Sequence, residues 1–483
     1  MSDKERKAVV SIVGAGLVGA LNAIYFAQRG WKVELYELRP DIRLNKESGK
    51  GKSINLALSE RGLSALRATH LGLEDMILEA SVPMKARMVH FGKEGTQMSQ
   101  PYSIHGQHIN AVDRARLNEL LLTAAELMDS VTVHFEHRLI QADLDKNQLE
   151  FMTKEGKKVI DDSDLIVGAD GAYSKTRSQM MRHMRMNLNQ EYIDTAYCEL
   201  MIPPEQGPDG QLRFALDPHH LHIWPRHVFM LIAIPNPDFS FTCTLFMPFK
   251  MFEDIKTEDD LFEFFTEHFN DAIPLIGKES LKDSYFHNPK GSLVTIKASP
   301  HNYSDKSIII GDAAHAMVPF YGQGMNCGFQ DVEVLHEILD QHSVLPMVGK
   351  DGKIKNLKEA LDDYSNVRVK DAHAICDLAM YNYYEMRHAV TSLSFLARKR
   401  LESSIHALFP HLVIPLYSMV SFSTIPYSVA IQRWHQQTRW LTLFMTTTTF
   451  GALGLTVFIG LKCRDRVMNS FRELILSIHK FIC

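Results

Sequence analysis

Apolar residues follow strand-like and helix-like patterns in turn along the chain, and their order predicts an α/β protein. Residues 7–13 (KAVVSIV) form a mainly apolar run that is typical of a buried strand. A glycine-rich turn follows, and an apolar helical segment then continues to Gly30. Residues 31–37 (WKVELYE) return to a strand pattern. Strand, helix and strand in this order predict a βαβ unit at the start of the chain.

The middle of the chain is richer in strand-like segments. Short alternating patterns occur between residues 130 and 170, and residues 190–250 are aromatic and β-branched, which predicts a mostly β region. The segment SIIIGDAAH at 307–315 resembles the first strand again, and the chain after it has a helical pattern to about residue 405. A nucleotide-binding domain interrupted by a β-sheet domain fits this order.

The C-terminal part of the chain has a different pattern. Residues 440–461 contain no charged side chain, and as an α-helix they would extend about 33 Å, compared with about 30 Å for a bilayer core. Arg439 precedes this stretch, and Lys462, Arg464 and Arg466 follow it, as is typical of membrane flanks. We therefore predict a transmembrane helix over 440–461; a buried core helix is the alternative.

Two neighbouring stretches extend this prediction. Residues 462–483 carry apolar residues at helical spacing beside basic ones and predict a basic amphipathic tail, either interfacial or frayed. Residues 407–431 form a second stretch of low charge. This stretch contains three prolines, which disfavour a regular spanning helix. We expect this second stretch to lie beside the membrane, and a second insertion remains an alternative.

Composition excludes several classes of protein. The 483 residues are 45% hydrophobic and carry a net charge of −5, which excludes a disordered chain and disfavours a non-specific nucleic-acid binder. The six cysteines form no C-x-x-C pair, so neither a zinc site nor a disulfide framework is predicted, and a reducing compartment fits. His219, His220 and His222 lack nearby acid or thiol ligands, and we predict no metal site.

A dinucleotide-binding fingerprint stands between the first predicted strand and helix. Gly14, Gly16 and Gly19 form G-x-G-x-x-G, in which glycines allow a tight turn and close approach of a pyrophosphate to the helix N-terminus. Glu37 ends the next strand, at the distance expected for a carboxylate that binds an adenosine ribose. This motif alone does not distinguish NAD from FAD.

Two later segments favour FAD. Asp170 and Gly171 follow a predicted strand and begin the pattern D-G-x-x-S-x-x-R, and Gly311 and Asp312 follow another strand ahead of the glycine-rich segment GQGMN at 322–326. An aspartate at a strand end can accept hydrogen bonds from a ribityl chain. A glycine-rich turn that enters a helix can direct amides at the flavin ring and stabilise negative charge on it.

These segments resemble those of the class A flavoprotein aromatic hydroxylases, the p-hydroxybenzoate hydroxylase type. Within that class the sequence is similar to the kynurenine 3-monooxygenase family in four segments. They are GKSINLALSERG (51–62), VPMKARM (82–88), DLAMYNYYEMR (377–387) and VIPLYSMVSFS (413–423). Only one Rossmann fingerprint is present, which agrees with a class in which NADPH binds transiently. Lys175 departs from the class, where a small hydroxylated residue is more typical.

The resemblance implies the domain order and the residues of the site. The α/β fold would contain a Rossmann-type FAD-binding domain, an inserted β-sheet substrate domain, a helical C-terminal region and the transmembrane helix. The expected segments are FAD-binding 1–80, 111–185 and 296–375, substrate-domain strands 81–110, substrate domain 186–295, and helical region 376–438. The implied substrate contacts are Arg87, Tyr102, Asn382 and Tyr417. The expected FAD contacts are Gly14, Gly16, Val18, Gly19, Tyr36, Glu37, Leu38, Arg39, Ala57, Arg114, Leu139, Asp170, Asp312, Met325 and Asn326.

The resemblance also implies the reaction and its location. It implies hydroxylation of L-kynurenine to 3-hydroxy-L-kynurenine, in tryptophan degradation, through a flavin C4a-hydroperoxide with bound FAD and with NADPH and O₂ as co-substrates. The flavin carries the chemistry, so no catalytic side chain or metal is expected. The implied location is the mitochondrial outer membrane, with the catalytic part facing the cytosol. Hydroxylation of another aromatic acid, a non-catalytic membrane-tethered flavoprotein scaffold and a C-terminal protein-interaction module remain alternatives.

Overall fold

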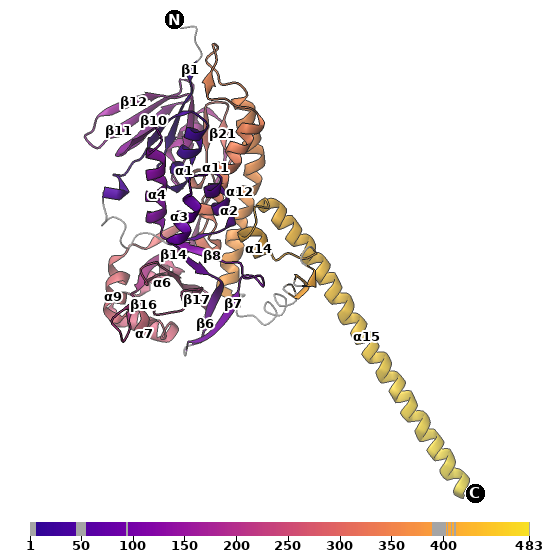
Figure 1. Cartoon of the computed structure of the whole chain (residues 1–483). Helices are drawn as coiled ribbons and strands as arrows, with labels where there is room; N and C mark the ends of the chain where they lie inside the picture. The colour runs from indigo at the N-terminus through magenta and orange to yellow at the C-terminus, as the bar shows by residue number, and fades with distance from the viewer. Residues whose placement is uncertain are drawn as a thin grey trace. The chain divides into compact units, whose positions relative to one another are not determined.

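The first strand and helix form where the apolar pattern predicts them. In the computed structural model (Figure 1), which describes residues 6–44, 55–92, 95–388, 402, 404–406, 408–409 and 412–482, β2 covers Val9–Val13 and α1 covers Leu17–Gln28. Strand β3, Lys32–Tyr36, then lies parallel to β2, with Val9 beside Lys32 and Val13 beside Tyr36. The predicted βαβ unit is confirmed.

This unit belongs to a six-stranded sheet with the order β21-β22-β13-β2-β3-β9. All neighbouring strands are parallel except the edge pair β21–β22. The remaining strands of the sheet are β9 (Val131–His134), β13 (Leu165–Gly168), β21 (Asn302–Tyr303) and β22 (Ser307–Ile309). Because parallel strands end at one edge, the chain segments that follow β2, β3, β13 and β22 meet there.

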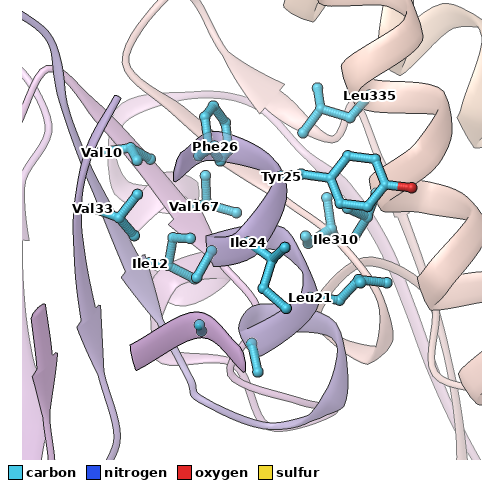
Figure 2. Close-up of a cluster of buried hydrophobic side chains, with 14 of the residues drawn as sticks. Val10, Ile12, Leu21, Ile24, Tyr25, Phe26, Val33, Val167, Ile310 and Leu335 are labelled. Carbon is cyan, nitrogen blue, oxygen red and sulfur yellow. The ribbon is translucent and has the colours of Figure 1, made fainter. Parts of the chain in front are cut away.

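Both faces of this sheet are buried, which explains its continuous apolar strands. On one face, α1 side chains such as Leu21, Ile24 and Phe26 lie between the sheet and the region of Leu335 (Figure 2). The helices on this face are α1, α2 (Glu60–Arg67), α3 (Leu73–Glu79), α4 (Arg114–Glu126) and α11 (Gly324–Gln341). The opposite face is covered by α5 (Lys175–His183) and by the strands β10 (His137–Asp143), β11 (Gln148–Thr153) and β12 (Lys158–Asp162).

A second, seven-stranded sheet has the order β20-β14-β19-β18-β17-β6-β7 and confirms the strand-rich prediction for 190–250. Its strands come from two separate parts of the chain, and β6 lies parallel to β17 while the other pairs are antiparallel. The strands are β6 (Ala86–Phe91), β7 (Thr96–Pro101), β14 (Asn187–Ile202), β17 (His220–Arg226), β18 (Phe229–Pro235), β19 (Phe241–Pro248) and β20 (Gly291–Ser299).

The seven-stranded sheet has helices on both faces. One face packs against α6 (Phe249–Asp254), α7 (Glu258–His268), α8 (Ile273–Ile276) and α9 (Lys278–His287). Toward the other face, Phe320 of the 3-10 helix η2 (Pro319–Tyr321) contacts Phe246, with ring centroids 4.9 Å apart. Tyr383 of the long helix α12 (Leu357–His388) hydrogen-bonds Thr195 at 2.5 Å. This second face carries Arg87.

A third, small sheet has three strands in the order β4-β8-β5. Its strands are β4 (Leu56–Leu58), β5 (Val82–Met84) and β8 (Ile109–Val112). The adjoining segment 51–54, part of the family-like stretch, lies outside the described residues. Within the helical C-terminal region, the short helix α14 covers Leu416–Ser421.

The last 55 residues form a second unit, Val429–Cys483, apart from the first unit, Met1–Ser428. Helix α15, Tyr427–Ile482, includes the predicted helix 440–461, and residues 462–482 continue it without a break. In the described part of the chain, however, no helix meets the length and apolarity needed to cross a membrane, so the predicted transmembrane helix is not found. Six threonines dilute the apolar character of residues 440–461.

The stretch 407–431, predicted to lie beside the membrane, is exposed at its start and buried further along the chain. Residues 407, 410 and 411 lie outside the described residues. Leu408, Phe409 and Leu412 are exposed, but Met419 and Tyr427 are fully buried in the first unit. The second half of this stretch is therefore part of the protein core, because its apolar side chains find partners there.

Candidate active site

The glycine turn after β2 has the geometry of a pyrophosphate site. Gly14 has a φ of +100° and donates its N–H to Tyr36 O at 2.7 Å, and a Cβ there would lie 2.5 Å from Ala169 O. A Cβ on Gly19 would lie 1.8 Å from Gly14 O. Packing thus requires these two glycines. Gly16, in contrast, is exposed, and no atom lies within 4 Å of the position that its Cβ would take. The open space at the N-terminus of α1 fits an anion.

The end of β3 supplies a carboxylate beside this turn. Glu37 Oε2 accepts the Ala15 N–H at 2.9 Å, and Oε1 accepts the Arg39 N–H at 3.0 Å. Each carboxylate oxygen keeps a further lone pair, so Glu37 can still accept hydrogen bonds from a ribose. Leu38 and Arg39 are exposed next to it. Four of the predicted cofactor contacts therefore meet at one edge of the sheet: Gly14, Gly16, Glu37 and Arg39.

Two predicted cofactor contacts have side chains that the core uses. The Tyr36 ring is buried between His134 and Phe151, with centroid distances of 4.7 and 4.0 Å. Leu139 is buried in the same cluster. The side chain of neither residue is free to bind a cofactor in this structure, and only their backbone atoms remain for such a contact.

The segment that follows β13 is held in its conformation by hydrogen bonds among its own residues. The Asp170 carboxylate accepts Ser174 Oγ at 2.5 Å and both the N–H and the Oγ1 of Thr176, at 2.9 and 3.1 Å. Arg177 donates to Ala313 O and to Ala172 O, both at 2.7 Å. In the structure Asp170, a predicted contact of the ribityl chain, is the centre of a local turn, which Arg177 joins to the segment after β22. Among the described residues, the Oδ1 of Asp170 accepts only the Ser174 hydroxyl, so the cofactor contact stays a prediction.

The segment after β22 presents an aspartate toward the same edge. Gly311 has a φ of +58°, and a Cβ there would lie 3.1 Å from Val18 Cγ2, so Val18 packs directly on this turn. Asp312 is exposed to solvent, yet desolvation by the surrounding protein raises the pKa of its carboxyl group, against the effect of Arg114. The Asp312 carboxyl group is thus accessible, yet surrounding protein atoms remove part of its hydration. Asp312 and the exposed Arg114 thus remain candidates for contacts to a cofactor.

The side chain of Asn326, a predicted cofactor contact, forms three hydrogen bonds within the protein. Its Nδ2 donates to Ala57 O at 2.7 Å and to Gly322 O at 2.9 Å, and its Oδ1 accepts the Ser59 N–H at 2.9 Å. The side chain therefore holds β4 against the start of α11, where Met325 is buried. The carboxyl edge of the six-stranded sheet, called the cofactor edge below, fits FAD together with this support: it offers an open anion site, a ribose acceptor and the accessible Asp312.

A buried charge cluster supports the segment after β22. Asp331 of α11 is fully buried; its Oδ2 accepts Gly311 N at 2.8 Å and His315 Nε2 at 2.5 Å, and its Oδ1 accepts Arg368 Nε at 2.6 Å. His315, Cys327 and Asp331 lie close enough to hold a metal ion. Arg368 already neutralises Asp331 and donates to Cys327 Sγ at 3.3 Å, so the group does not favour a cation.

A second cluster gathers three of the four predicted substrate contacts. The Tyr102 and Tyr417 rings stack with centroids 4.8 Å apart and an interplanar angle of 9°. The Arg87 guanidinium carbon lies 5.8 Å from the Tyr102 centroid and 5.3 Å from that of Tyr417. Tyr321 also stacks on Tyr417, with ring centroids 5.9 Å apart. The tyrosine rings thus form an aromatic surface next to the buried Arg87 guanidinium.

This cluster contains buried polar atoms that no protein group satisfies. Among the described residues, Arg87 Nε and Tyr102 Oη are buried without a hydrogen-bond partner. Burial opposes the charge of Arg87, but Tyr102, Glu385 and Tyr417 outweigh it and raise the pKa of the guanidinium. A buried, charged guanidinium with a free N–H next to a free phenol fits an anionic ligand, above all a carboxylate.

Asn382, the fourth predicted contact, lies beside this cluster. Its Nδ2 donates to Phe320 O at 2.7 Å and contacts Met386 Sδ at 3.2 Å. It therefore fastens η2, which carries Tyr321, to α12.

Glu385, which the sequence pattern did not single out, pairs with Arg87. Its Oε1 lies 3.4 Å from Arg87 NH1, and the side chain is largely buried. Glu385 follows Asn382 by three residues in a helical segment, and this spacing places both on one face of α12. That spacing was the available signal. Tyr321 was missed as well, and no local pattern distinguishes it from a core tyrosine.

Comparisons with known proteins agree with this geometry. A family model described as FAD binding domain matches residues 7–344. Kynurenine 3-monooxygenase of Drosophila willistoni is 45% identical over 465 residues, 95% of this chain and 97% of that protein. The Sus scrofa enzyme of the same name is 42% identical over 479 residues, 97% of each chain.

The fold also has solved counterparts. The structure of a 2-methyl-3-hydroxypyridine-5-carboxylic acid oxygenase superposes with a TM-score of 0.63 at 20% identity, covering 81% of this chain and 95% of that one. The likeness is to the fold alone. Together with the sequence relatives and the matched FAD-binding domain, it shows that the chain belongs to the kynurenine 3-monooxygenase family of FAD-dependent aromatic hydroxylases.

Proposed function

We propose that this protein hydroxylates L-kynurenine to 3-hydroxy-L-kynurenine, with FAD as bound cofactor and NADPH and O₂ as co-substrates. The observation that carries the proposal is the buried Arg87, whose Nε, like the nearby phenol of Tyr102, finds no hydrogen-bond partner among the residues that the structure describes. Family membership supplies the substrate, since the named relatives are kynurenine 3-monooxygenases.

The chemistry of the substrate matches the cluster group by group. L-kynurenine carries an α-carboxylate, an α-ammonium and an aminophenyl ketone. Arg87 can bind the carboxylate through two parallel N–H donors, and Tyr102 can add an O–H donor. Glu385, 3.4 Å from Arg87, is placed to accept the ammonium. The rings of Tyr417 and Tyr321 offer an apolar surface to the aromatic part.

The protein then acts by orientation and by excluding water. FAD, when bound, supplies the redox chemistry, with electrons from NADPH and an oxygen atom from O₂. Gly16, Glu37 and Asp312 would hold it at the carboxyl edge of the six-stranded sheet. Asn382 and Asn326 tie the segment 319–326 to α12 and β4, so the cofactor edge and the aromatic cluster are joined through that one segment.

The test is a flavin spectrum followed by NADPH oxidation. We expect the purified protein to be yellow, and L-kynurenine to accelerate NADPH oxidation and yield 3-hydroxy-L-kynurenine by mass spectrometry. Anthranilate and 4-hydroxybenzoate are matched controls, because they carry a carboxylate on the ring but no amino-acid group. A colourless protein would support the scaffold alternative. Faster turnover with another aromatic acid would replace kynurenine as the substrate.

We also propose that the C-terminal helix attaches the enzyme to the mitochondrial outer membrane, with the catalytic unit in the cytosol. The support is a run of exposed apolar side chains in the uncharged stretch 440–461. They are Trp440, Leu443, Phe450, Leu455, Val457, Phe458, Ile459 and Leu461. Basic residues flank the stretch on both sides, which suits an anionic lipid surface.

Truncation tests the attachment. Removal of residues 439–483 is expected to release the protein from sedimented membranes while it keeps its FAD and its kynurenine-dependent turnover, because the cluster around Arg87 lies in the first unit. A matched control replaces Trp440, Leu443, Phe450 and Phe458 by serine in the full chain, which should release the protein in the same way. Continued sedimentation of both variants with membranes would contradict the proposal.

A further inference from the structure

The position of α14 decides the shape of the aromatic cluster, since this helix carries Tyr417. Tyr417 stacks on Tyr102 at 4.8 Å and on Tyr321 at 5.9 Å, and it faces Arg87. The helix has only six residues, Leu416–Ser421. A helix of this length is not stable through its own backbone hydrogen bonds, and the carbonyls of its last turn have no partners within it. Other groups must hold α14 in place.

Arg61 of α2 is such a group. Its Nε donates to Val420 O at 2.9 Å, and its NH2 donates to Met419 O at 3.2 Å and to Ile425 O. Two of these carbonyls belong to the last turn of α14, where a cation is also favoured by the helix dipole. Arg61 is 359 residues away from Val420 in the chain. One side chain therefore caps the helix and holds the loop that follows it.

The rest of the Arg61 environment is unusual for a structural arginine. The side chain is 0% exposed, and among the described residues no carboxylate lies within salt-bridge distance of it. Its remaining contacts are Gln330 Oε1, 3.0 Å from NH1, and the ring of Tyr427, 3.9 Å from the guanidinium carbon. Burial of an unpaired cation is unfavourable, and an apolar residue would fill the same space without that cost. What the guanidinium adds is the simultaneous contact with three carbonyls.

The same side chain also connects α14 to the cofactor edge. Gln330 Oε1 accepts a second hydrogen bond from Arg368 NH1 at 3.1 Å, and Arg368 Nε donates to Asp331 at 2.6 Å. Asp331 in turn accepts the Gly311 N–H. A continuous series of buried hydrogen bonds thus runs from the turn after β22 to the helix that carries Tyr417.

We propose that Arg61 is a positioning residue for substrate recognition: by holding α14, it keeps Tyr417 stacked on Tyr102 beside Arg87 and so shapes the end of the pocket that receives the α-carboxylate. The inference rests on the proposed function, because it takes L-kynurenine as the ligand. Arg61 does not itself touch the Arg87 cluster; it acts through α14.

The test compares two ligands on the FAD-loaded full chain. Binding of L-kynurenine and of kynurenamine, the same molecule without its carboxylate, is followed by the change in flavin absorbance. In Arg61→Met, which keeps the volume but loses every donor, the Kd of L-kynurenine should rise about tenfold or more. The Kd of kynurenamine should change less than about twofold, which is no more than a surface substitution far from the site would cause. FAD content should stay equal to that of the wild type.

Arg67→Met is the matched control. Arg67 lies on the same helix, but its side chain is 51% exposed and pairs with Glu60 and Glu74. Both Kd values should be unchanged in this variant. Arg61→Lys keeps the charge with a single donor group, and it should show the same selective loss to a smaller extent; it replaces Arg61→Met if that variant does not fold.

The outcomes separate the two proposals. Equal weakening of both ligands in the Arg61 variants, or no weakening of either, would overturn the role of Arg61, provided that the wild type prefers L-kynurenine. If the wild type shows no preference for L-kynurenine over kynurenamine, the proposed recognition of the carboxylate fails instead.

Discussion

Replacement of Arg87 by methionine is expected to weaken L-kynurenine binding about 100-fold or more, because the variant loses a charge-assisted, bidentate contact worth about 3 kcal/mol. The guanidinium is the buried cation of the aromatic cluster, and its Nε has no hydrogen-bond partner in the part of the chain that the structure describes. The protein should stay yellow, since none of the predicted cofactor segments contains Arg87. The measurement is the Kd of L-kynurenine from flavin absorbance, together with KM and kcat.

Glu385 and a second arginine provide the controls. Arg87→Met leaves Glu385 without its cation, so Arg87→Met combined with Glu385→Gln separates lost carboxylate binding from that unpaired charge. Arg226 is a largely buried arginine on the same sheet that donates to His268 O, His90 O and Gly92 O. Arg226→Met should lower stability without changing the Kd. A Kd for Arg87→Met within twofold of the wild type would refute the carboxylate assignment.

Asp331→Asn is expected to lower the free energy of unfolding by about 3 kcal/mol or more, because it leaves two buried cationic partners without a counter-charge. Those partners are His315 and Arg368, at 2.5 and 2.6 Å. Gly311 also depends on this carboxylate for its N–H, so the FAD content should fall in parallel. Urea unfolding and the flavin-to-protein absorbance ratio measure the two effects.

The pH dependence of the stability lost in Asp331→Asn shows which charged groups cause the loss. Burial by itself would raise the pKa of Asp331, but His315 and Arg368 hold that pKa well below its usual range. Its contribution to stability is therefore present above the unfolded pKa of about 4 and is lost as the pH falls. Burial opposes the charge of His315, yet Asp331 raises the pKa of His315 well above its usual value. The contribution of His315 to stability is complete below its unfolded pKa of about 6.5 and is lost as the pH rises. The difference between wild type and variant should thus be largest between about pH 4 and 6.5.

An exposed aspartate of the same helix is the control. Asp340 pairs with Arg29 at 2.5 Å, but its side chain is 73% exposed. Asp340→Asn should change the free energy of unfolding by less than about 1 kcal/mol. An equal effect of the two substitutions would contradict the role given to the buried cluster.

Local segments were predicted well because their causes are local. The turn at Gly14 needs a positive φ and lacks room for a Cβ, and both conditions follow from a strand, a sharp turn and a helix in direct succession. The same holds for the helix over residues 440–461, whose apolar pattern sets its secondary structure but not its surroundings. Asp170 shows the limit of such reasoning. Its pattern predicts a cofactor contact, but the pattern does not show that Ser174 and Thr176, a few residues away, also donate to the carboxylate.

Long-range partners could not be predicted from the pattern. Arg87 and Glu385 are 298 residues apart, and Arg61 is 359 residues from Val420. A charged residue in an apolar segment indicates that it needs a partner, but many distant groups could supply one. Which group does so depends on how the sheets and α12 pack, and that packing minimises the free energy of the whole chain rather than of any segment.

Steric limits and hydrophobic periodicity within short segments were enough to predict the βαβ unit, the strand-rich insertion and the helical end of the chain. The family was predicted from the resemblance of longer motifs, and the sequence relatives confirm it. The contact of Glu385 with Arg87, the supporting roles of Asp331 and Asn326 and the capping of α14 by Arg61 could be found only in the folded chain. A buried hydrogen bond or ion pair needs both partners within about 3 to 4 Å, and folding alone brings residues that are distant in the sequence this close together.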